Sequence, residues 1–187
     1  MARTPSNMLP LGTKAPEFSL TDTISGETMT LQSGKGSRGT VIMFICNHCP
    51  FVKHVNSEIT GIAREYTAKG IGFIAISSND VENYPQDAPD LMKETARREG
   101  YTFPYLYDET QDVAHAYHAA CTPDFYLFDE QLKLVYRGQL DDSRPGNGIA
   151  LTGSDLRSAL DALLQDQPIS QDQKPSIGCN IKWFVPQ

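Results

Sequence analysis

Two apolar runs, residues 41–45 and 71–77, stand out in the pattern of hydrophobic and polar positions. Runs that do not alternate with polar residues are typical of strands buried on both faces of a parallel sheet. Between them, the segment from Phe51 to about Lys69 predicts a helix that ends at Gly70, because glycine commonly follows the last helical turn. The order strand, helix, strand predicts a parallel βαβ unit.

The rest of the chain predicts two hairpins and three further helices. The hairpins join residues 15–20 to 28–31 and 125–128 to 132–137, and the helices cover 90–99, 111–118 and a final segment capped by Ser154. A parallel half is thus followed by a ββα half. We expect an α/β fold with a central mixed sheet flanked by helices, an N-terminal β-hairpin and a C-terminal extension.

One domain accounts for the length of the chain, 187 residues. We expect its core at about residues 14–166 and a tail, residues 167–187, that packs back on it. This tail ends in an apolar stretch around Trp183 that calls for a surface to cover it.

Composition narrows the possible partners. The net charge is −7, and the pI is about 5.0, which disfavours nucleic acid and anionic membranes as partners. No secretory signal or spanning segment is recognisable, so we expect a cytoplasmic protein, in which thiols are kept reduced. The oligomeric state is left open.

Candidate chemistry centres on Cys46-Asn47-His48-Cys49, where the first buried strand gives way to a helix. Pro50 fits the first turn of that helix, where its missing N–H costs nothing. Unpaired backbone N–H groups at a helix N-terminus stabilise a thiolate, which is the nucleophile in disulfide exchange. The pattern therefore predicts a redox-active pair formed by Cys46 and Cys49.

Two plainer interpretations compete with this one. Cysteines are common in protein cores, so the pair could be structural. Structural zinc needs four ligands, often as two pairs, and here Cys121 and Cys179 each stand alone. We therefore expect no metal and no cofactor.

Four segments, residues 12–18, 44–50, 122–129 and 178–183, carry a family likeness along nearly the whole chain. The chain resembles the thioredoxin-like superfamily and, within it, the alkyl hydroperoxide reductase/thiol-specific antioxidant (peroxiredoxin-like) family, in the subgroup with a thioredoxin-style CxxC. The resemblance implies a thioredoxin-like fold and a redox enzyme with roles in antioxidant activity and cell redox homeostasis. It also implies that Pro123 is a cis proline facing the cysteine pair.

The chain departs from typical peroxiredoxins, which carry Pro-x-x-x-Thr-x-x-Cys-Pro. Aligning their peroxidatic cysteine with Cys49 keeps Pro50 but puts Cys46 in place of the threonine and Ile42 in place of the proline. The family's downstream arginine has no counterpart near Pro123. The hydroxyl and guanidinium groups that polarise a peroxide bond are therefore missing from the motif.

The leading hypothesis is a thiol-disulfide oxidoreductase in which Cys46 attacks and Cys49 resolves the mixed disulfide. A protonated His48 would favour the thiolate, and His48, Thr122 and Pro123 are the expected substrate-positioning residues. The backbone of Thr122 could pair with an extended substrate strand. Expected partners are a protein or small-molecule disulfide or thiol, and the thioredoxin or glutathione system.

Two alternatives remain. In the first, a thiol peroxidase, Cys49 takes an oxygen from peroxide to become a sulfenic acid, and Cys46 condenses with it. In the second, a non-catalytic redox sensor, the pair oxidises reversibly without turnover. Cys121 and Cys179 are candidate third thiols in any of these schemes.

Overall fold

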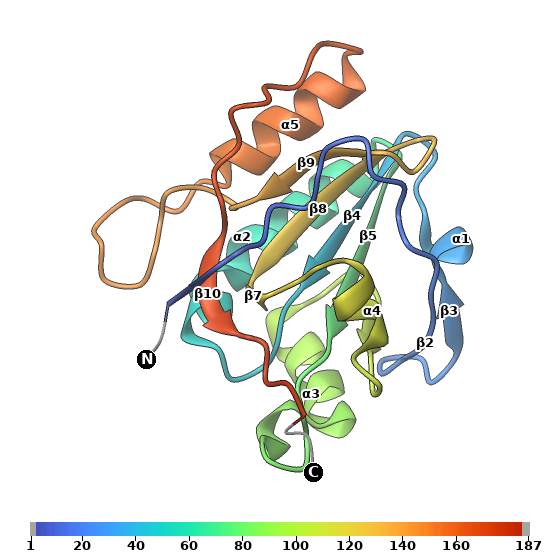
Figure 1. Cartoon of the computed structure of the whole chain (residues 1–187), viewed down its shortest axis with the longest axis vertical. Coiled ribbons are helices and arrows are strands. Elements are labelled where there is room, and N and C mark those ends of the chain that lie inside the picture. The colour runs from blue at the N-terminus through green and yellow to red at the C-terminus, as the bar shows by residue number, and fades with distance from the viewer. Residues whose placement is uncertain (1–2, 185–187) are drawn as a thin grey trace.

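A seven-stranded mixed sheet forms the centre of the computed structural model, which describes residues 3–184 (Figure 1). From edge to edge its strands are β3 (Thr28–Thr30), β2 (Ser19–Asp22), β6 (Tyr105–Tyr107), β5 (Ile71–Ser77), β4 (Gly39–Phe44), β8 (Asp124–Asp129) and β9 (Leu134–Gly138). The strands β4, β5 and β6 are parallel, and every other pairing in the sheet is antiparallel. The predicted α/β class and central mixed sheet are confirmed.

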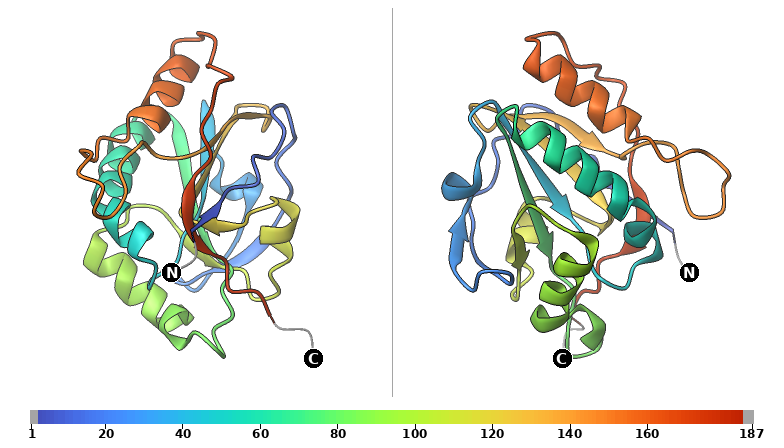
Figure 2. Two further views of the ribbon diagram at one scale, coloured as in Figure 1. Left: turned by 60° about the vertical axis from the view of Figure 1, so that its left-hand side comes forward. Right: turned by 180° about the vertical axis from the view of Figure 1, so that it is seen from behind.

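Helices cover both faces of this sheet. One face carries α2 (Pro50–Thr67), α3 (Pro89–Glu99) and α5 (Ser154–Leu164), and the other carries the short helices α1 (Leu31–Gly34) and α4 (Asp112–Ala116). Figure 2 shows α2, α3 and α5 together on one side. A 3-10 turn, η1 (Pro85–Asp87), precedes α3.

The central strand β4 explains the first apolar run, because its side chains enter two cores. Met43 packs with α2 on one face, whereas Ile42 and Phe44 pack with α1 and α4 on the other. All three side chains are at most 1% exposed. Burying a side chain of this size contributes about 1.5–3 kcal/mol, so β4 is held firmly from both faces.

A second, small sheet brings the C-terminal tail onto the domain. Its order is β1-β10-β7, formed by β1 (Thr4–Pro5), β10 (Ile177–Asn180) and β7 (Cys121–Thr122), and both pairings are antiparallel. In Figure 1, β10 runs across the front of the molecule beside β7. The last three residues of the expected tail, 185–187, lie outside the described part of the chain.

The structure corrects two local predictions. Ser154 does not cap the final helix, because Gly153 occupies the N-cap position with φ of 65° and Ser154 is the first helical residue. The second expected strand of the first hairpin, residues 28–31, also ends one residue early, because Leu31 begins the short helix α1. Both differences concern positions where a polar or glycine-rich sequence is compatible with several backbone conformations.

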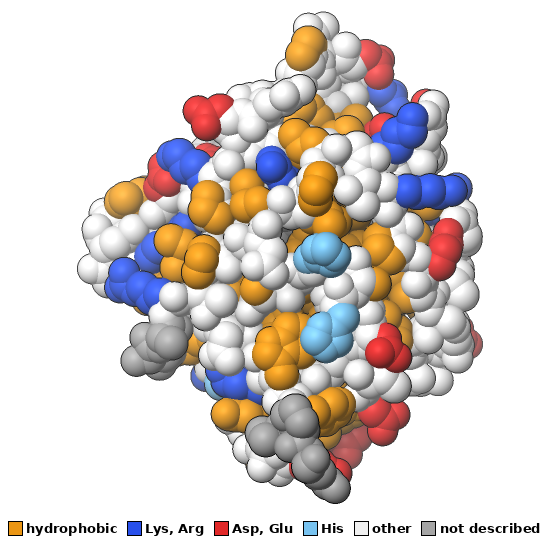
Figure 3. Space-filling view, viewed as in Figure 1, with side chains coloured by type: hydrophobic (Ala, Val, Ile, Leu, Met, Phe, Trp, Pro, Cys, Tyr) orange, Lys and Arg blue, Asp and Glu red, His pale blue; other side chains and the backbone are white. Residues whose placement is uncertain are grey.

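The surface of the fold carries both charged and apolar side chains. Within the described residues, no helix is both long enough and apolar enough to span a bilayer. Figure 3 shows acidic and basic side chains interspersed on one face, with apolar groups between them.

We expect Gly178→Ala to destabilise the protein by about 1–3 kcal/mol, the usual cost of overpacking. A Cβ at Gly178 would lie 1.9 Å from the carbonyl oxygen of Thr122, so only glycine lets β10 approach β7 this closely. Gly61→Ala is the matched control, because a Cβ there meets nothing within 4 Å. Chemical unfolding of both variants measures the difference, and equal stability would contradict the tight packing of β10.

Candidate active site

The end of β4 delivers the cysteine pair to the N-terminus of α2. The backbone N–H of Ile45 donates to the carbonyl of Ile76 at 3.0 Å, which continues the parallel pairing up to the motif. Cys49 is the N-cap residue of α2 in an extended conformation, and Pro50 follows as the first helical residue. The chain thus leaves the sheet at Cys46 and enters the helix at Cys49, as the sequence predicts.

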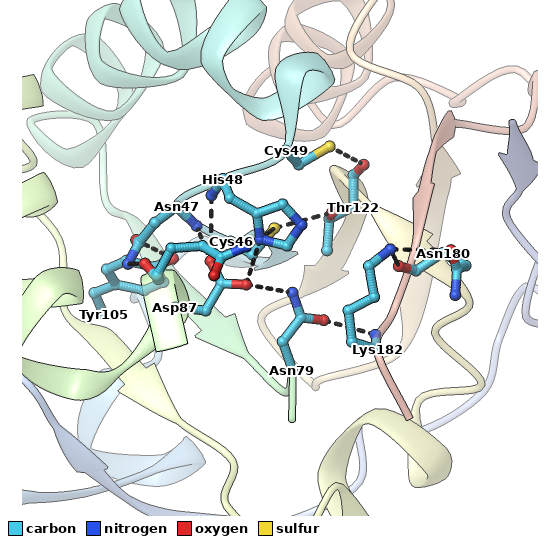
Figure 4. A network of polar contacts seen from close by, with 11 residues as sticks. Cys46, Asn47, His48, Cys49, Asn79, Asp87, Tyr105, Thr122, Asn180 and Lys182 are labelled. Atoms are coloured by element: carbon cyan, nitrogen blue, oxygen red, sulfur yellow. Dashed lines mark hydrogen bonds and ion pairs between the residues drawn. The ribbon is translucent and has the colours of Figure 1, made fainter. Parts of the chain in front are cut away.

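Both sulfurs are buried beside Thr122 (Figure 4). Cys46 is 2% exposed and Cys49 is fully buried. The Sγ atom of Cys46 lies 3.5 Å from the hydroxyl of Thr122, and the Cys49 thiol donates to the Thr122 carbonyl at 3.3 Å. The Thr122–Pro123 peptide bond is cis, as the resemblance implies. The structure therefore brings Cys46, Cys49, Thr122 and Pro123 together.

The two thiols differ in acidity when the pair is reduced. A hydrogen bond from Cys46 is the main cause that lowers the pKa of Cys49 to about 5, helped by Cys179 and the backbone N–H of Val52 against the opposing effect of burial. The same bond to Cys49, burial and the charge of Asp87 raise the pKa of Cys46 well above its ordinary value. The first thiolate of the reduced pair is therefore on Cys49.

Asp87, in η1, fixes the backbone of the Cys46–Cys49 motif. Its carboxylate accepts hydrogen bonds from the backbone N–H groups of Asn47 at 2.8 Å and His48 at 3.2 Å, and from the Asn79 amide at 2.8 Å. Burial alone would raise the pKa of Asp87, but the hydrogen bonds from His48 and Asn79 outweigh it and lower this pKa. Asp87 thus fixes the backbone of the motif and places a charge beside Cys46.

His48 lies at the side of this cluster. Its Nδ1 atom is 2.5 Å from Asp87 Oδ2 and 4.0 Å from Cys46 Sγ, and its ring stacks on Tyr84 with centroids 5.8 Å apart. The ring is half-buried and oriented by Asp87 and Tyr84. A proton on Nδ1 would be shared with Asp87 first, which limits how strongly His48 stabilises a Cys46 thiolate.

Three side chains at this place have atoms suitable for a metal ion. The ligating atoms of Cys46, His48 and Asp87 lie within 4.8 Å of one another. Zinc prefers four ligands in a tetrahedral arrangement, and here the Asp87 oxygens already accept backbone and amide hydrogen bonds. An ion would have to replace the His48 to Asp87 hydrogen bond.

The two other cysteines occupy different positions. Cys179, on β10, pairs with Thr122 in register and helps to lower the pKa of Cys49. Cys121, on β7, is fully buried with its sulfur 3.9 Å from the Pro123 carbonyl, and burial raises its pKa. The structure therefore packs Cys179, and not Cys121, into one apolar cluster with the pair.

The tail also occupies one edge of Thr122. An extended substrate strand on that edge would have to displace β10, which pairs there already. The tail is fixed further along, where the Lys182 N–H donates to Asn79 Oδ1 at 2.8 Å and the Lys182 carbonyl accepts from Asp80 N–H at 2.8 Å (Figure 4). Asn79 in turn bonds Asp87, so the tail and the motif share one polar network.

Sequence reasoning missed Asp87, Asn79 and Lys182. Asp87 lies 40 residues from Asn47 along the chain, in a loop without periodicity, so no local signal indicates the contact. Of these contacts, only the docking of the tail had a weak signal in the sequence, because the apolar residues of the tail needed a surface to cover them. Trp183, for example, stacks on His115 with centroids 4.4 Å apart.

A buried cysteine pair at a helix N-terminus, facing a cis proline, defines a thioredoxin-like redox protein. The model of the AhpC/TSA family matches residues 11–137, more than half of the chain, and the chain therefore belongs to this family. A search of curated proteins finds no match.

Several solved structures are similar to this chain. An uncharacterized conserved protein from Geobacillus kaustophilus is 60% identical, with a TM-score of 0.98 over 100% of this chain and 99% of that one. A hypothetical protein from Sinorhizobium meliloti 1021 is 45% identical, with a TM-score of 0.95 over 98% and 100%. The thioredoxin domain of a thiol-disulfide oxidoreductase from Bacteroides vulgatus, 19% identical with a TM-score of 0.58 over 73% and 90%, shares the fold.

We expect the reduced protein to carry a single thiolate that titrates near pH 5, where the pKa of Cys49 lies. Because this pKa is below the ordinary value of 9.0, the thiolate stabilises the reduced folded protein fully above pH 9.0, and this contribution is lost as the pH falls through 5. Ultraviolet absorbance of the thiolate measures the titration.

Cys49→Ser should abolish this low titration, whereas Cys121→Ser, the buried control, should leave it in place. A wild-type protein that gains thiolate absorbance only above pH 8 would contradict the assignment, since that is the range in which an ordinary cysteine titrates.

Proposed function

We propose that this protein is a thiol-disulfide oxidoreductase that opens and closes a disulfide between Cys46 and Cys49. The observation that supports this most directly is the placement of both buried sulfurs against Thr122 at the start of α2, with the Cys49 pKa lowered to about 5. A low thiolate pKa at a helix N-terminus is characteristic of cysteines that exchange disulfides. Membership of the AhpC/TSA family supports redox chemistry in general.

In the proposed cycle, Cys46 attacks the substrate disulfide and Cys49 resolves the mixed disulfide. The lowered pKa of Cys49 makes it the thiolate of the reduced pair and so favours it as the nucleophile. The access of a substrate to the sulfur favours Cys46 instead, because Cys49 has no exposed surface. We give access precedence, since attack requires contact between the sulfur and the substrate. The proton that the two sulfurs share moves to Cys49 as Cys46 attacks, and the low pKa of Cys49 then releases it for resolution.

Neighbouring residues would assist this cycle. The Thr122 hydroxyl, 3.5 Å from Cys46 Sγ, can donate to the attacking thiolate, and the cis Pro123 follows Thr122 directly. His48 lies beside Cys46 and would contact an incoming substrate. We propose disulfides or thiols of proteins or small molecules as substrates, with a thioredoxin or glutathione system completing the cycle in a cytoplasmic setting.

A thiol peroxidase is the second candidate, and the lowered pKa of Cys49 is the observation that favours it. In this scheme the Cys49 thiolate takes one oxygen from the peroxide, water leaves, and the Cys46 thiol condenses with the sulfenic acid. Against it, no arginine hydrogen-bonds either sulfur within residues 3–184, and Cys49 is closed to solvent.

We expect Cys49→Ser to accumulate a mixed disulfide through Cys46 when the reduced variant meets a disulfide such as oxidised glutathione. The resolving sulfur is then missing, so the intermediate cannot collapse. Mass spectrometry of the intact variant and of its peptides, without reductant, detects the adduct and its position.

Cys121→Ser serves as the control and should release the adduct as the wild type does, because Cys121 faces away from the pair. If Cys46→Ser retains the adduct on Cys49 and Cys49→Ser shows none, the two cysteines exchange roles.

The reduced wild type should react with hydrogen peroxide no faster than an ordinary free thiolate, because the groups that polarise the peroxide bond are missing. Stopped-flow fluorescence or competition with a reference peroxidase measures this rate. An enhancement of several orders of magnitude, lost in Cys49→Ser, would favour the peroxidase instead.

A further inference from the structure

The C-terminal strand β10 places a third cysteine beside the redox pair. Cys179 stands opposite Thr122 in the antiparallel ladder with β7, so their side chains project from the same face. The Thr122 hydroxyl is 3.5 Å from Cys46 Sγ on that face, and the Thr122 carbonyl accepts from Cys49. The register of the small sheet therefore aims Cys179 at the pair.

The packing of Cys179 supports the orientation that the strand register indicates. Cys179 is 4% exposed and belongs to the same apolar cluster as Cys46, Cys49 and Val52. Gly178, the preceding residue, allows β10 to come so close to Thr122 that any side chain there would collide. This cysteine thus lies in a tightly packed strand that borders the redox pair on the side of Cys49.

We propose that Cys179 is a third redox-active thiol, which attacks Cys49 in the Cys46–Cys49 disulfide. The new bond joins Cys49 to Cys179, the bond between Cys46 and Cys49 breaks, and the Cys179 proton passes to Cys46. The step exchanges one disulfide for another, so no electrons are gained or lost. The proposal rests on the proposed function, because it requires the Cys46–Cys49 disulfide as its starting point.

The charge of the site makes this exchange depend on the redox state. In the reduced protein, burial, the hydrogen bond to Cys49 and the Cys49 charge raise the pKa of Cys179 to about 12, so Cys179 stays protonated. Once Cys49 is part of a disulfide, the Cys49 charge and that hydrogen bond are gone. Cys179 then loses its proton more readily, at the stage when the disulfide is there to attack.

The exchange would have two consequences. Cys46 becomes a thiol again while the protein stays oxidised. In addition, the tail becomes covalently attached to the N-terminus of α2. Cys121 cannot replace Cys179 in this role, because its cross-strand partner is Asn180 and its sulfur contacts the Pro123 carbonyl.

The test uses Cys46→Ser, which retains three of the four cysteines. Oxidised glutathione is the oxidant: Cys179, which keeps some exposed surface, attacks it, and the Cys49 thiolate then displaces glutathione from Cys179. We block the remaining thiols with N-ethylmaleimide in denaturant and digest without reductant. We expect a disulfide-linked pair of peptides containing Cys49 and Cys179, and intact protein carrying one adduct where the reduced variant carries three.

Two matched variants make the result specific. Cys46→Ser with Cys121→Ser should form the same disulfide, whereas Cys46→Ser with Cys179→Ser should form no disulfide within the protein. Wild-type protein treated in the same way reports the Cys46–Cys49 disulfide and so tests the proposed function separately.

If the wild type forms the Cys46–Cys49 disulfide but Cys46→Ser leaves Cys179 alkylated, the proposed exchange with Cys179 is wrong and the proposed function stands. A link between Cys49 and Cys121 would also overturn it. If Cys46→Ser does not fold, the wild type decides, because equilibrated oxidised protein should contain both the Cys46–Cys49 and the Cys49–Cys179 peptides.

Discussion

The central strand β4 is the constraint on which the rest of the structure depends. It pairs with β5 on one edge and β8 on the other, and both of its faces are buried. Its end is therefore fixed in position, and the motif that follows has only a few residues in which to enter α2. The strand β8 brings the cis Pro123 to the same place, because the proline directly precedes it. The cysteine pair and the proline meet as a consequence of sheet register.

The cysteine motif and Thr122 are surrounded by segments that lie far from them in the sequence. Asp87 holds the backbone of the motif, Asn79 links Asp87 to the tail, and β10 closes one edge of Thr122. Each of these contacts satisfies a buried polar group, which would otherwise cost about 1–3 kcal/mol. The tail is therefore part of the active-site wall.

The sequence predicted what depends on local pattern and failed where contacts are long-range. The apolar runs indicated β4 and β5, and Pro50 indicated the helix start, because burial and a proline in the first helical turn leave local signatures. Pro123 was placed by resemblance. Asp87 and β10 could not be predicted, since a single carboxylate in a loop and a four-residue strand carry no periodicity. The Ser154 cap was wrong because Gly153, with positive φ, takes that position.

The balance between burial and hydrogen bonding sets the direction of the chemistry. Burial opposes a thiolate at Cys49, yet its pKa is lowered, so the hydrogen bonds to this sulfur outweigh the loss of solvation. They exist only in the reduced protein, because a disulfide carries no charge for them to stabilise. In the proposed cycle the thiolate stabilises the reduced form, so a disulfide between Cys46 and Cys49 would be a stronger oxidant. Because Cys179 helps to lower the pKa of Cys49, the docked tail would contribute to that oxidising character.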